Sequence, residues 1–245
     1  MSIHANLEPL VWDSQFFGLS TARLHLLQEA SPEAAALTSD LLDEFALVQA
    51  KVPAQQTAII DGLSALGFSL VEGEADLLLS IGAGDITGTH TGQDAEPKLI
   101  SAKAQDIPAL KAVAARVFTS SRFRAPWYQP DDSGRFYATW VEKAVLGTFD
   151  HECLLINDEH GQMMGFVTLR DIGSHEARIG LLAAVPGNPH QGIGKKLMSA
   201  AQQWCLHHQI YRLRVATQIS NISALRLYTR RGAIIESTAY WLYRG

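Results

Sequence analysis

The chain has 245 residues, a formal net charge of −5 and a hydrophobic content of 47%. This composition excludes an intrinsically disordered chain, and because no run of lysines or arginines occurs, binding to a nucleic-acid backbone is not expected. The sequence has neither 18 consecutive apolar residues nor a basic start followed by an apolar run, so we expect a cytoplasmic protein without membrane insertion.

The first part of the chain ends in a stretch rich in glycine, threonine and aspartate, residues 80–98, which predicts a loop or linker. We therefore expect an N-terminal α+β module with its linker over residues 1–97 and a second domain over residues 98–245. Hydrophobic spacing divides the module into elements. In chain order these are a helix over 33–51, a helix over 57–66 ended by Gly67, and strands over 68–71 and 75–81 with Glu72, Gly73 and Glu74 between or within them.

The second domain alternates between helical and strand patterns. Asp106 is a good N-cap for its first helix, and Asp132 or Ser133 is one for its second. The expected elements are a strand over 99–102, helices over 107–118 and 133–145, strands over 152–157, 163–171 and 177–185, a helix over 194–208, a strand over 212–217, a helix over 223–230 and a strand pair within 233–243. This order predicts an α+β fold in which helices flank a mixed, mainly antiparallel sheet.

A glycine-bearing turn leads from the strand over 177–185 into the helix over 194–208. The first N–H groups of a helix lack internal acceptors and lie at the positive end of its dipole, so they suit a diphosphate. Gly192 and Gly194 would let the backbone approach such a group closely. Neither the nucleoside triphosphate pattern Gly-x4-Gly-Lys-Ser/Thr nor the dinucleotide pattern Gly-x-Gly-x-x-Gly fits the turn. Taken alone, the turn is also consistent with a plain strand-to-helix connection.

Two segments here resemble the Gcn5-related N-acetyltransferase superfamily. The run Pro189-His190-Gln191-Gly192-Ile193-Gly194 is similar to its acyl-CoA loop, Gln/Arg-x-x-Gly-x-Gly/Ala, and departs from it at Pro189, which has neither a polar side chain nor an N–H. The segment from Asn221 to Gly232 resembles its Asn-x6-Tyr-x3-Gly segment in order and distance. The resemblance implies the Gcn5-related N-acetyltransferase fold, acetyl-CoA as the donor co-substrate, and Tyr228 as the general acid that protonates the departing thiolate.

The donor-site residues are predicted from this resemblance and from simple chemistry. Thiol and phenol pKa values lie within about two units, so a hydrogen bond from Tyr228 stabilises charge developing on sulfur, although this residue alone also fits a core tyrosine. The exposed edge of the strand over 177–185 is expected to hold the pantetheine arm, and one of its amides to bind the carbonyl oxygen. The residues predicted to bind acetyl-CoA are Leu181, Leu182, Ala183, Gln191, Gly192, Ile193, Gly194, Lys195, Asn221 and Arg226.

Residues 120–140 place three arginines among aromatic side chains, after the first helix of the second domain. Arginines can clamp a diphosphate and aromatic faces can stack a base or a sugar, and a nucleotide-linked acceptor would use both. The same composition also fits an aromatic core stripe with solvated arginines. The candidate substrate-binding residues are Arg122, Arg124, Trp127, Tyr128 and Arg135.

A closer resemblance covers essentially the whole chain and is weakest over residues 80–98 and 185–191. The stretches LEPLVWDSQFFG, LGFSLVEGEADL, SRFRAPWYQPDDSGRFYATW and RLRVATQISNISALRLYTRRG are similar to the enterobacterial dTDP-4-amino-4,6-dideoxygalactose (dTDP-fucosamine) N-acetyltransferase family. This resemblance implies acetyl transfer to the 4-amine of a dTDP-linked amino sugar in enterobacterial common antigen biosynthesis. It also points to Glu72 as a general base acting through a water, where the residues alone favour a turn carboxylate.

Other functions remain open at this point. One is a catalytically silent acyl-CoA or nucleotide-sugar sensor with the same fold, and another is an acetyltransferase for a protein N-terminus or a polyamine. The intact Tyr228 weighs against the first, and the arginine cluster weighs against the second. A covalent route through Cys153 has no base partner in the sequence, and no metal site is predicted. The sequence does not decide whether the chain forms a homodimer.

Overall fold

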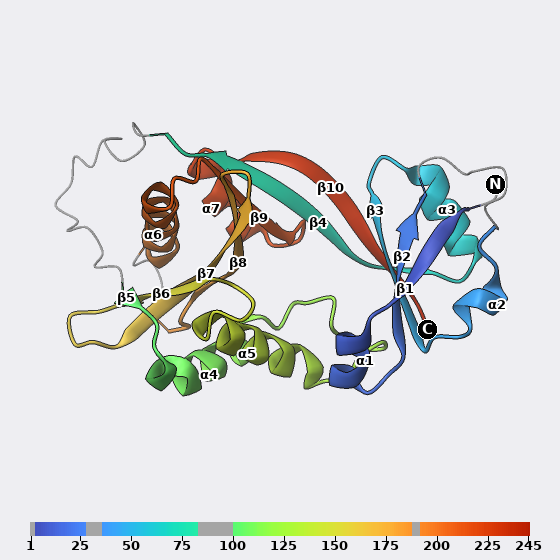
Figure 1. Cartoon of the computed structure of the whole chain (residues 1–245), viewed down its shortest axis with the longest axis horizontal. Helices are drawn as coiled ribbons and strands as arrows, with labels where there is room; N and C mark the ends of the chain where they lie inside the picture. Colours follow the sequence, from blue (N-terminus) through green and yellow to red (C-terminus); the bar gives the residue numbers. More distant parts are fainter. Residues whose placement is uncertain (1–2, 28–35, 83–99, 188–191) are drawn as a thin grey trace.

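The computed structural model describes residues 3–27, 36–82, 100–187 and 192–245. One mixed sheet of ten strands runs through these residues in the order β1-β2-β3-β10-β4-β9-β8-β7-β6-β5 (Figure 1). The strands are β1 (Ala5–Pro9), β2 (Thr21–Leu26), β3 (Leu47–Pro53), β4 (Ser69–Ser80), β5 (Ile100–Ser101), β6 (Glu152–Asn157), β7 (Met163–Gly173), β8 (Glu176–Ala184), β9 (Arg212–Gln218) and β10 (Ile234–Arg244). The helices are α1 (Val11–Phe17), α2 (Ser39–Leu42), α3 (Thr57–Ala65), α4 (Ile107–Val117), α5 (Asp132–Val145), α6 (Ile193–His207) and α7 (Ile222–Arg230), with a 3₁₀ turn η2 (Ala104–Asp106) before α4.

The predicted α+β fold, a mixed and mainly antiparallel sheet with flanking helices, is confirmed. Only the pairs β2–β3 and β8–β9 are parallel among the strand pairs of the described ranges. The predicted helix over 57–66 is α3, and Gly67 follows it with a φ of +86°. From β6 to α7 each predicted element is present within two residues of its expected bounds. None of the described helices is long and apolar enough to cross a membrane.

The predicted helix over 33–51 is wrong, apart from the residues 33–35 that lie outside the described ranges. Only α2 is helical there, and β3 takes up the chain from Leu47. Val48, Ala50 and Val52 fit a strand because alternate residues of a strand share one face, and here all three are fully buried in one core cluster. β3 pairs with β2 on one side and with β10 on the other, so long-range pairing overrides the local helical spacing.

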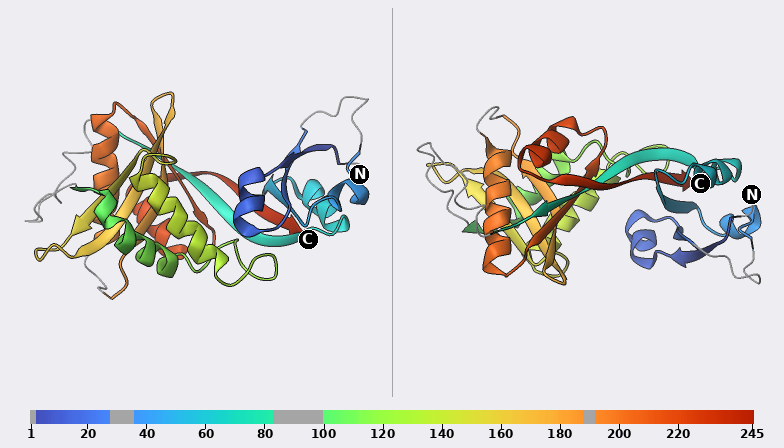
Figure 2. Two further views of the ribbon diagram at one scale, coloured as in Figure 1. Left: turned by 60° about the horizontal axis from the view of Figure 1, so that its bottom comes forward. Right: turned by 90° about the horizontal axis from the view of Figure 1, so that it is seen from above.

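Two long strands, β4 and β10, join the front part of the sheet, formed by β1, β2 and β3, to its back part, formed by β5 to β9 (Figures 1 and 2). The expected pair of strands within 233–243 is wrong, because β10 is a single strand that absorbs a register shift between Ile235 and Ser237. β4 likewise runs without a break through Glu72, Gly73 and Glu74. The far end of β10 pairs with β3, so the end of the chain completes the sheet of the first module. The predicted domain boundary between residues 97 and 98 stays a prediction.

The caps of α4 and α5 differ from the expected geometry. Asp106 occupies the N-cap position of α4, but its carboxylate accepts the Lys103 N–H at 2.8 Å, across η2. Asp131, rather than Asp132 or Ser133, is the N-cap residue of α5. Asp132 instead accepts the Gln129 N–H at 2.9 Å, so these carboxylates stabilise the turns that lead into the helices.

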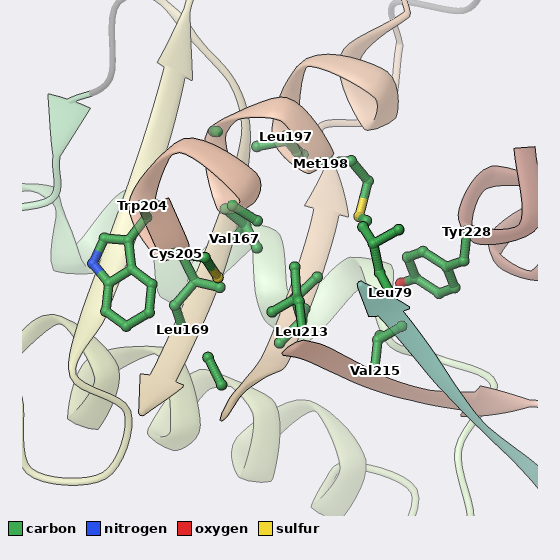
Figure 3. Close-up of a cluster of buried hydrophobic side chains, with 14 of the residues drawn as sticks. Leu79, Val167, Leu169, Leu197, Met198, Trp204, Cys205, Leu213, Val215 and Tyr228 are labelled. Carbon is green, nitrogen blue, oxygen red and sulfur yellow. The ribbon is translucent and has the colours of Figure 1, made fainter. Parts of the chain in front are cut away.

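Separate hydrophobic clusters cover the two ends and faces of the sheet. At the back, Leu197, Met198 and Trp204 of α6 pack on β7 and β9, and Tyr228 lies at the edge of this cluster (Figure 3). The helices α4 and α5 cover the opposite face there. At the front, α3 packs on one face of β3 and β10, while an aromatic cluster that includes Phe17, Phe123 and Trp241 covers the other. The aromatic face is the one that continues into the functional site.

Candidate active site

The sheet splits open between β8 and β9. These strands pair in parallel only from Glu176 to Ile179 on β8, and beyond Ile179 no pairing joins them. A cavity of about 1070 Å³ lies at the split. Its walls at this point are Gly180, Leu181, Leu182 and Ala184 from β8, and Ala216, Thr217 and Gln218 from β9. The diverging strand edge thus presents unpaired backbone to a cavity.

The direction of the β8 amides follows from its pairing with β7. Val185 donates its N–H to the Met164 carbonyl at 2.8 Å, and hydrogen-bonded pairs alternate along antiparallel strands. Ala183 therefore also pairs toward β7, whereas Leu182 and Ala184 turn their backbone groups toward the split. Both of these residues line the cavity and Ala183 does not.

A bulge occupies the next step of the same strand. The register shifts between Val167 and Leu169 of β7, and the Leu181 N–H is donated to Thr168 Oγ1 at 2.9 Å. Of the three residues predicted to hold the pantetheine arm, Leu181, Leu182 and Ala183, only Leu182 directs its backbone groups into the cavity. Ala184, which was not predicted, does so as well. Sequence spacing could not reveal this, because the bulge changes which residues face each side.

The two glycines of the turn into α6 have different structural roles. Gly192 is the N-cap residue with a φ of +65°, in the left-handed region that favours glycine. A Cβ at Gly194 would lie 3.0 Å from Leu227 Cδ2, so this glycine permits close packing of α6 against α7. Gly194 lines the cavity, Ile193 is buried in the core and Lys195 is exposed. The predicted contact at Gln191, like the deviating Pro189, lies outside the described residues.

The start of α7 carries the second predicted segment. Asn221 lines the cavity and caps the helix, since its Oδ1 accepts the Ala224 N–H at 3.1 Å. Arg226 is exposed and is not part of the cavity wall.

Tyr228 lies in the cavity wall and is only 5% exposed. Its ring packs beside Leu79 and Val215 (Figure 3). Burial raises the pKa of its phenol to about 12, so this group carries its proton at neutral pH. Within the described part of the chain, no hydrogen-bond partner engages its hydroxyl. The hydroxyl is therefore a proton donor available to a bound molecule.

Glu72 lines the same cavity from β4, directly opposite Trp241 of β10. Burial raises the pKa of its carboxyl to about 7, outweighing the nearby Arg122 charge and the hydrogen bonds from the Gln218 side chain and the Arg122 backbone, which lower it. Such a carboxyl takes up and releases a proton near neutral pH. The neighbouring Gly73 lets the β9–α7 connection approach, because a Cβ there would lie 2.4 Å from Ile219 Cδ1.

Of the five predicted substrate-binding residues, only Arg122 lines the cavity. Tyr128 is buried and its hydroxyl accepts the Gln49 amide at 2.8 Å. Arg124 is exposed and donates to the Val71 carbonyl at 3.2 Å, with its guanidinium over the ring of Trp127. Arg135 pairs with Asp132 at 2.6 Å. Much of this segment therefore packs the aromatic cluster at the front of the sheet.

Several cavity residues were not among the predicted ones. They come from five different strands and are Arg23 (β2), Lys51 (β3), Glu74 (β4), Gln218 (β9) and Trp241 (β10). Glu74 accepts hydrogen bonds from Lys51 Nζ and, at 2.9 Å, from Trp241 Nε1. A correct strand assignment for residues 47–53 would have placed Gln49 and Lys51 on one face, but the pairing partners of that face are long-range.

The thiol of Cys153 lies apart from the cavity. Cys153 is buried outside the cavity wall, and burial raises the pKa of its thiol, which keeps it a poor nucleophile. No group of histidine, cysteine, aspartate and glutamate side chains that could hold a metal ion occurs in the described ranges.

Comparisons with known proteins place these features in context. Residues 116–233 match the acetyltransferase (GNAT) family. The chain is 46% identical over 244 residues to the dTDP-fucosamine acetyltransferase of Escherichia coli O6:H1 (strain CFT073), with 100% of both chains covered. Among solved structures, a GCN5-related N-acetyltransferase from Sphaerobacter thermophilus has a TM-score of 0.64 at 11% identity, covering 99% of this chain and 76% of that one. A tandem GNAT protein from the clavulanic acid biosynthesis pathway has a TM-score of 0.62 at 14% identity, covering 92% of this chain and 77% of that one.

Proposed function

The chain belongs to the acetyltransferase (GNAT) family, and from that premise we propose that it transfers the acetyl group of acetyl-CoA to the 4-amine of dTDP-4-amino-4,6-dideoxygalactose. The acceptor assignment rests on the 46% identity, over the whole of both chains, to a dTDP-fucosamine acetyltransferase. This acceptor places the reaction in enterobacterial common antigen biosynthesis, as the sequence resemblance implies.

The donor end of the cavity is the part lined by the β8 edge and the starts of α6 and α7. Its residues fit an acyl-CoA because Leu182 and Ala184 offer strand-like hydrogen bonds to a pantetheine arm. The N–H groups at the start of α6, from Gly192 to Lys195, have no acceptor within the helix, so they suit the diphosphate. We assign the same role to Gln191 from the family motif alone.

The acceptor end is the part lined by Arg23, Lys51, Glu72, Arg122 and Trp241. In the proposed reaction, Glu72 removes a proton from the substrate ammonium group through a water, and the neutral amine attacks the thioester carbon. A backbone N–H on the β8 edge stabilises the oxyanion, and as the C–S bond breaks Tyr228 gives its proton to the thiolate. As the intermediate collapses, the nitrogen loses its second proton to water, so the products are the N-acetyl sugar nucleotide and CoA. Glu72 then releases its proton to water and Tyr228 regains one, which restores both side chains.

Direct attack is the simplest route that fits the cavity. The base and the acid line one cavity, while the thiol of Cys153 lies outside its wall. A catalytically silent sensor would have no need for a buried carboxyl whose pKa is raised to about 7 in the same cavity as a protonated phenol. An acceptor with several positive charges would face Arg23, Lys51 and Arg122 at close range, which disfavours a polyamine.

A thiol-release assay tests this function. Acetyl-CoA is offered with dTDP-4-amino-4,6-dideoxygalactose, with a polyamine and with a peptide, and free CoA is followed over time. We expect turnover with the dTDP-amino sugar and an N-acetylated product of the corresponding mass. Turnover with the peptide or polyamine but with no dTDP-amino sugar would overturn the acceptor assignment while leaving acetyl transfer intact.

A further inference from the structure

A row of polar side chains crosses the aromatic face of the sheet at the acceptor end. Strand register places Arg23 of β2 opposite Gln49 of β3, and Gln49 opposite Tyr243 of β10. Two residues along the strands, the register continues as Lys51 opposite Trp241 and Trp241 opposite Glu72. Because residues two apart share a face, these side chains all stand on the same side of the sheet. The proposed base therefore ends a continuous polar surface that begins at Arg23.

Three cations gather around the indole of Trp241 on this surface. The Arg122 guanidinium lies 4.1 Å from a ring centroid of Trp241, the Arg23 guanidinium 5.4 Å and the Lys51 ammonium 5.7 Å. Trp241 is only 6% exposed, so the indole is a fixed support for the charges above it. Lys51 forms an ion pair with Glu74, which leaves the two arginines to be accounted for.

The two arginines share neutral acceptors. Arg122 donates to Gln49 Oε1 at 3.2 Å and to Tyr243 Oη, and Arg23 donates to the same Gln49 Oε1 at 3.4 Å. Among the described residues, no carboxylate forms an ion pair with either guanidinium, and Arg23 Nε is buried without a hydrogen-bond partner. Asp13 of α1 is electrostatically coupled to both arginines but forms no ion pair with them.

The other two arginines of the cavity each have a carboxylate within 4.0 Å. Arg178 Nη2 lies 2.8 Å from Asp76 Oδ2, and Arg170 Nε lies 4.0 Å from Asp150 Oδ1. Two like charges held close together without an ion-pair partner repel each other, and the same pair stabilises an anion placed between them. Arg23 and Arg122 can therefore both bind a ligand anion that enters the cavity.

We propose that Arg23 and Arg122, supported by Trp241, bind the diphosphate of the nucleotide-sugar acceptor. This assignment rests on the proposed function and adds to it the residues that select a nucleotide diphosphate. Trp241 and Glu72 face each other on neighbouring strands, which lie about 4.8 Å apart. A diphosphate above the indole thus directs the attached sugar toward Glu72, with its amine within reach of the base. Arg124 and Arg135, although close in sequence to Arg122, have no part in this site.

The test separates the nucleotide from the acetyl donor. Arg23→Gln, Arg23→Lys and, as a matched control, Arg116→Gln at the exposed end of α4 are compared with the parent. We expect Arg23→Gln to raise KM for the dTDP-amino sugar and the dissociation constant of free dTDP about 10-fold or more, because a charge-assisted bond to phosphate is lost. KM for acetyl-CoA should stay within about twofold, and Arg23→Lys should recover part of the dTDP affinity.

Calorimetric titration with dTDP needs no turnover, so it tests the site separately from the reaction. Parent turnover with the dTDP-amino sugar, together with an unchanged KM and dTDP affinity in Arg23→Gln, would overturn the diphosphate site alone. Absence of parent turnover would overturn the proposed function, and the dTDP titration would still decide the role of Arg23. If Arg23→Gln loses its thermal transition, Arg23→Lys is used for the test instead. Equal dTDP affinity and salt dependence in that variant and the parent would then contradict a phosphate contact through the Arg23 guanidinium.

Discussion

The donor end of the cavity is built from one contiguous stretch of chain, Gly180 to Tyr228, whereas the acceptor end collects side chains from Arg23 to Trp241. The donor end presents mainly backbone groups, whose positions depend on a bulge, a left-handed glycine and a helix cap. The acceptor end presents charged side chains on the face of a sheet. Under the proposed function, local backbone geometry binds the co-substrate common to the family, and residues that only the tertiary fold brings together select the second substrate.

This contrast predicts where substitutions will act most strongly. Side chains at the acceptor end are expected to exchange protons with the substrate or to bind its charged groups. Replacing them should therefore lower the reaction rate or the substrate affinity. Side chains at the donor end mostly hold the backbone in place, so their loss is expected to appear first in stability. The following substitutions test this difference, beginning with the largest expected effect.

Replacement of Glu72 by glutamine should cause the largest loss. At neutral pH we expect kcat/KM for the amino sugar to fall by about 100-fold or more, because the general base is removed. Since the pKa of Glu72 is raised to about 7, the parent rate should increase with pH through this value and then level off. A pH–rate profile of the variant that runs parallel to that of the parent would show that another group accepts the proton.

The same variant should be more stable than the parent at alkaline pH. The folded Glu72 has a pKa of about 7 against an ordinary 4.5, so its favourable contribution is complete below 4.5 and is lost as the pH rises through 7. Above that pH the buried carboxylate opposes folding, and glutamine relieves it by an amount on the order of 2 kcal/mol. Thermal melting of both proteins at pH 5 and pH 8 checks this sign and shows that the variant is folded.

Replacement of Tyr228 by phenylalanine should lower kcat by about 10- to 100-fold, because the thiolate must then leave without a proton donor. KM for acetyl-CoA should change by less than about twofold, since the phenol is expected to act on the transition state rather than on binding. Steady-state kinetics with both substrates varied gives both constants. An unchanged kcat would remove the acid role and leave Tyr228 as a residue of the α7 core contact.

Sequence reasoning reached the donor end because its signals are local. Gly192 and Gly194 indicate a tight turn into a helix, and Asn221 and Tyr228 stand at a fixed spacing on the next helix. None of these inferences needs the partner of a strand. The bulge at Thr168 was missed, since the sequence shows only a normal alternation there.

The acceptor end was reached only in part, and for a physical reason. Lys51 was assigned to a helix, and Trp241 to a short strand pair, so neither could be placed beside Glu72. Their proximity depends on the register of β3, β10 and β4, which is set by pairing between residues almost 200 positions apart. Arg124 and Arg135 looked equivalent to Arg122 in sequence, but the structure turns only Arg122 into the cavity.

Replacement of Thr168 by valine tests the bulge at the donor end. Valine keeps the shape but leaves the Leu181 N–H without its acceptor at 2.9 Å, so we expect a loss of about 1–3 kcal/mol in unfolding free energy. KM for acetyl-CoA should rise a few-fold as the strand edge relaxes, while dTDP affinity stays the same. The matched control Thr148→Val removes an exposed hydroxyl that bonds to the Lys143 carbonyl at 3.3 Å and should affect neither. An equal loss of unfolding free energy in both variants would show that the hydrogen bond from Leu181 does not stabilise the fold beyond an ordinary surface hydroxyl.

The smallest effect is expected for Asn221→Ala. Asn221 Oδ1 caps α7 through the Ala224 N–H, and loss of such a cap typically costs about 1 kcal/mol. Asn221→Ser preserves a capping oxygen and should recover most of this stability in denaturant unfolding. Because the oxygen is already engaged, we expect KM for acetyl-CoA to rise by no more than about threefold in either variant. A rise of tenfold or more that is equal in the alanine and serine variants would instead mean that the carboxamide itself binds acetyl-CoA, and the donor end would then depend on a side chain in the same way as the acceptor end does.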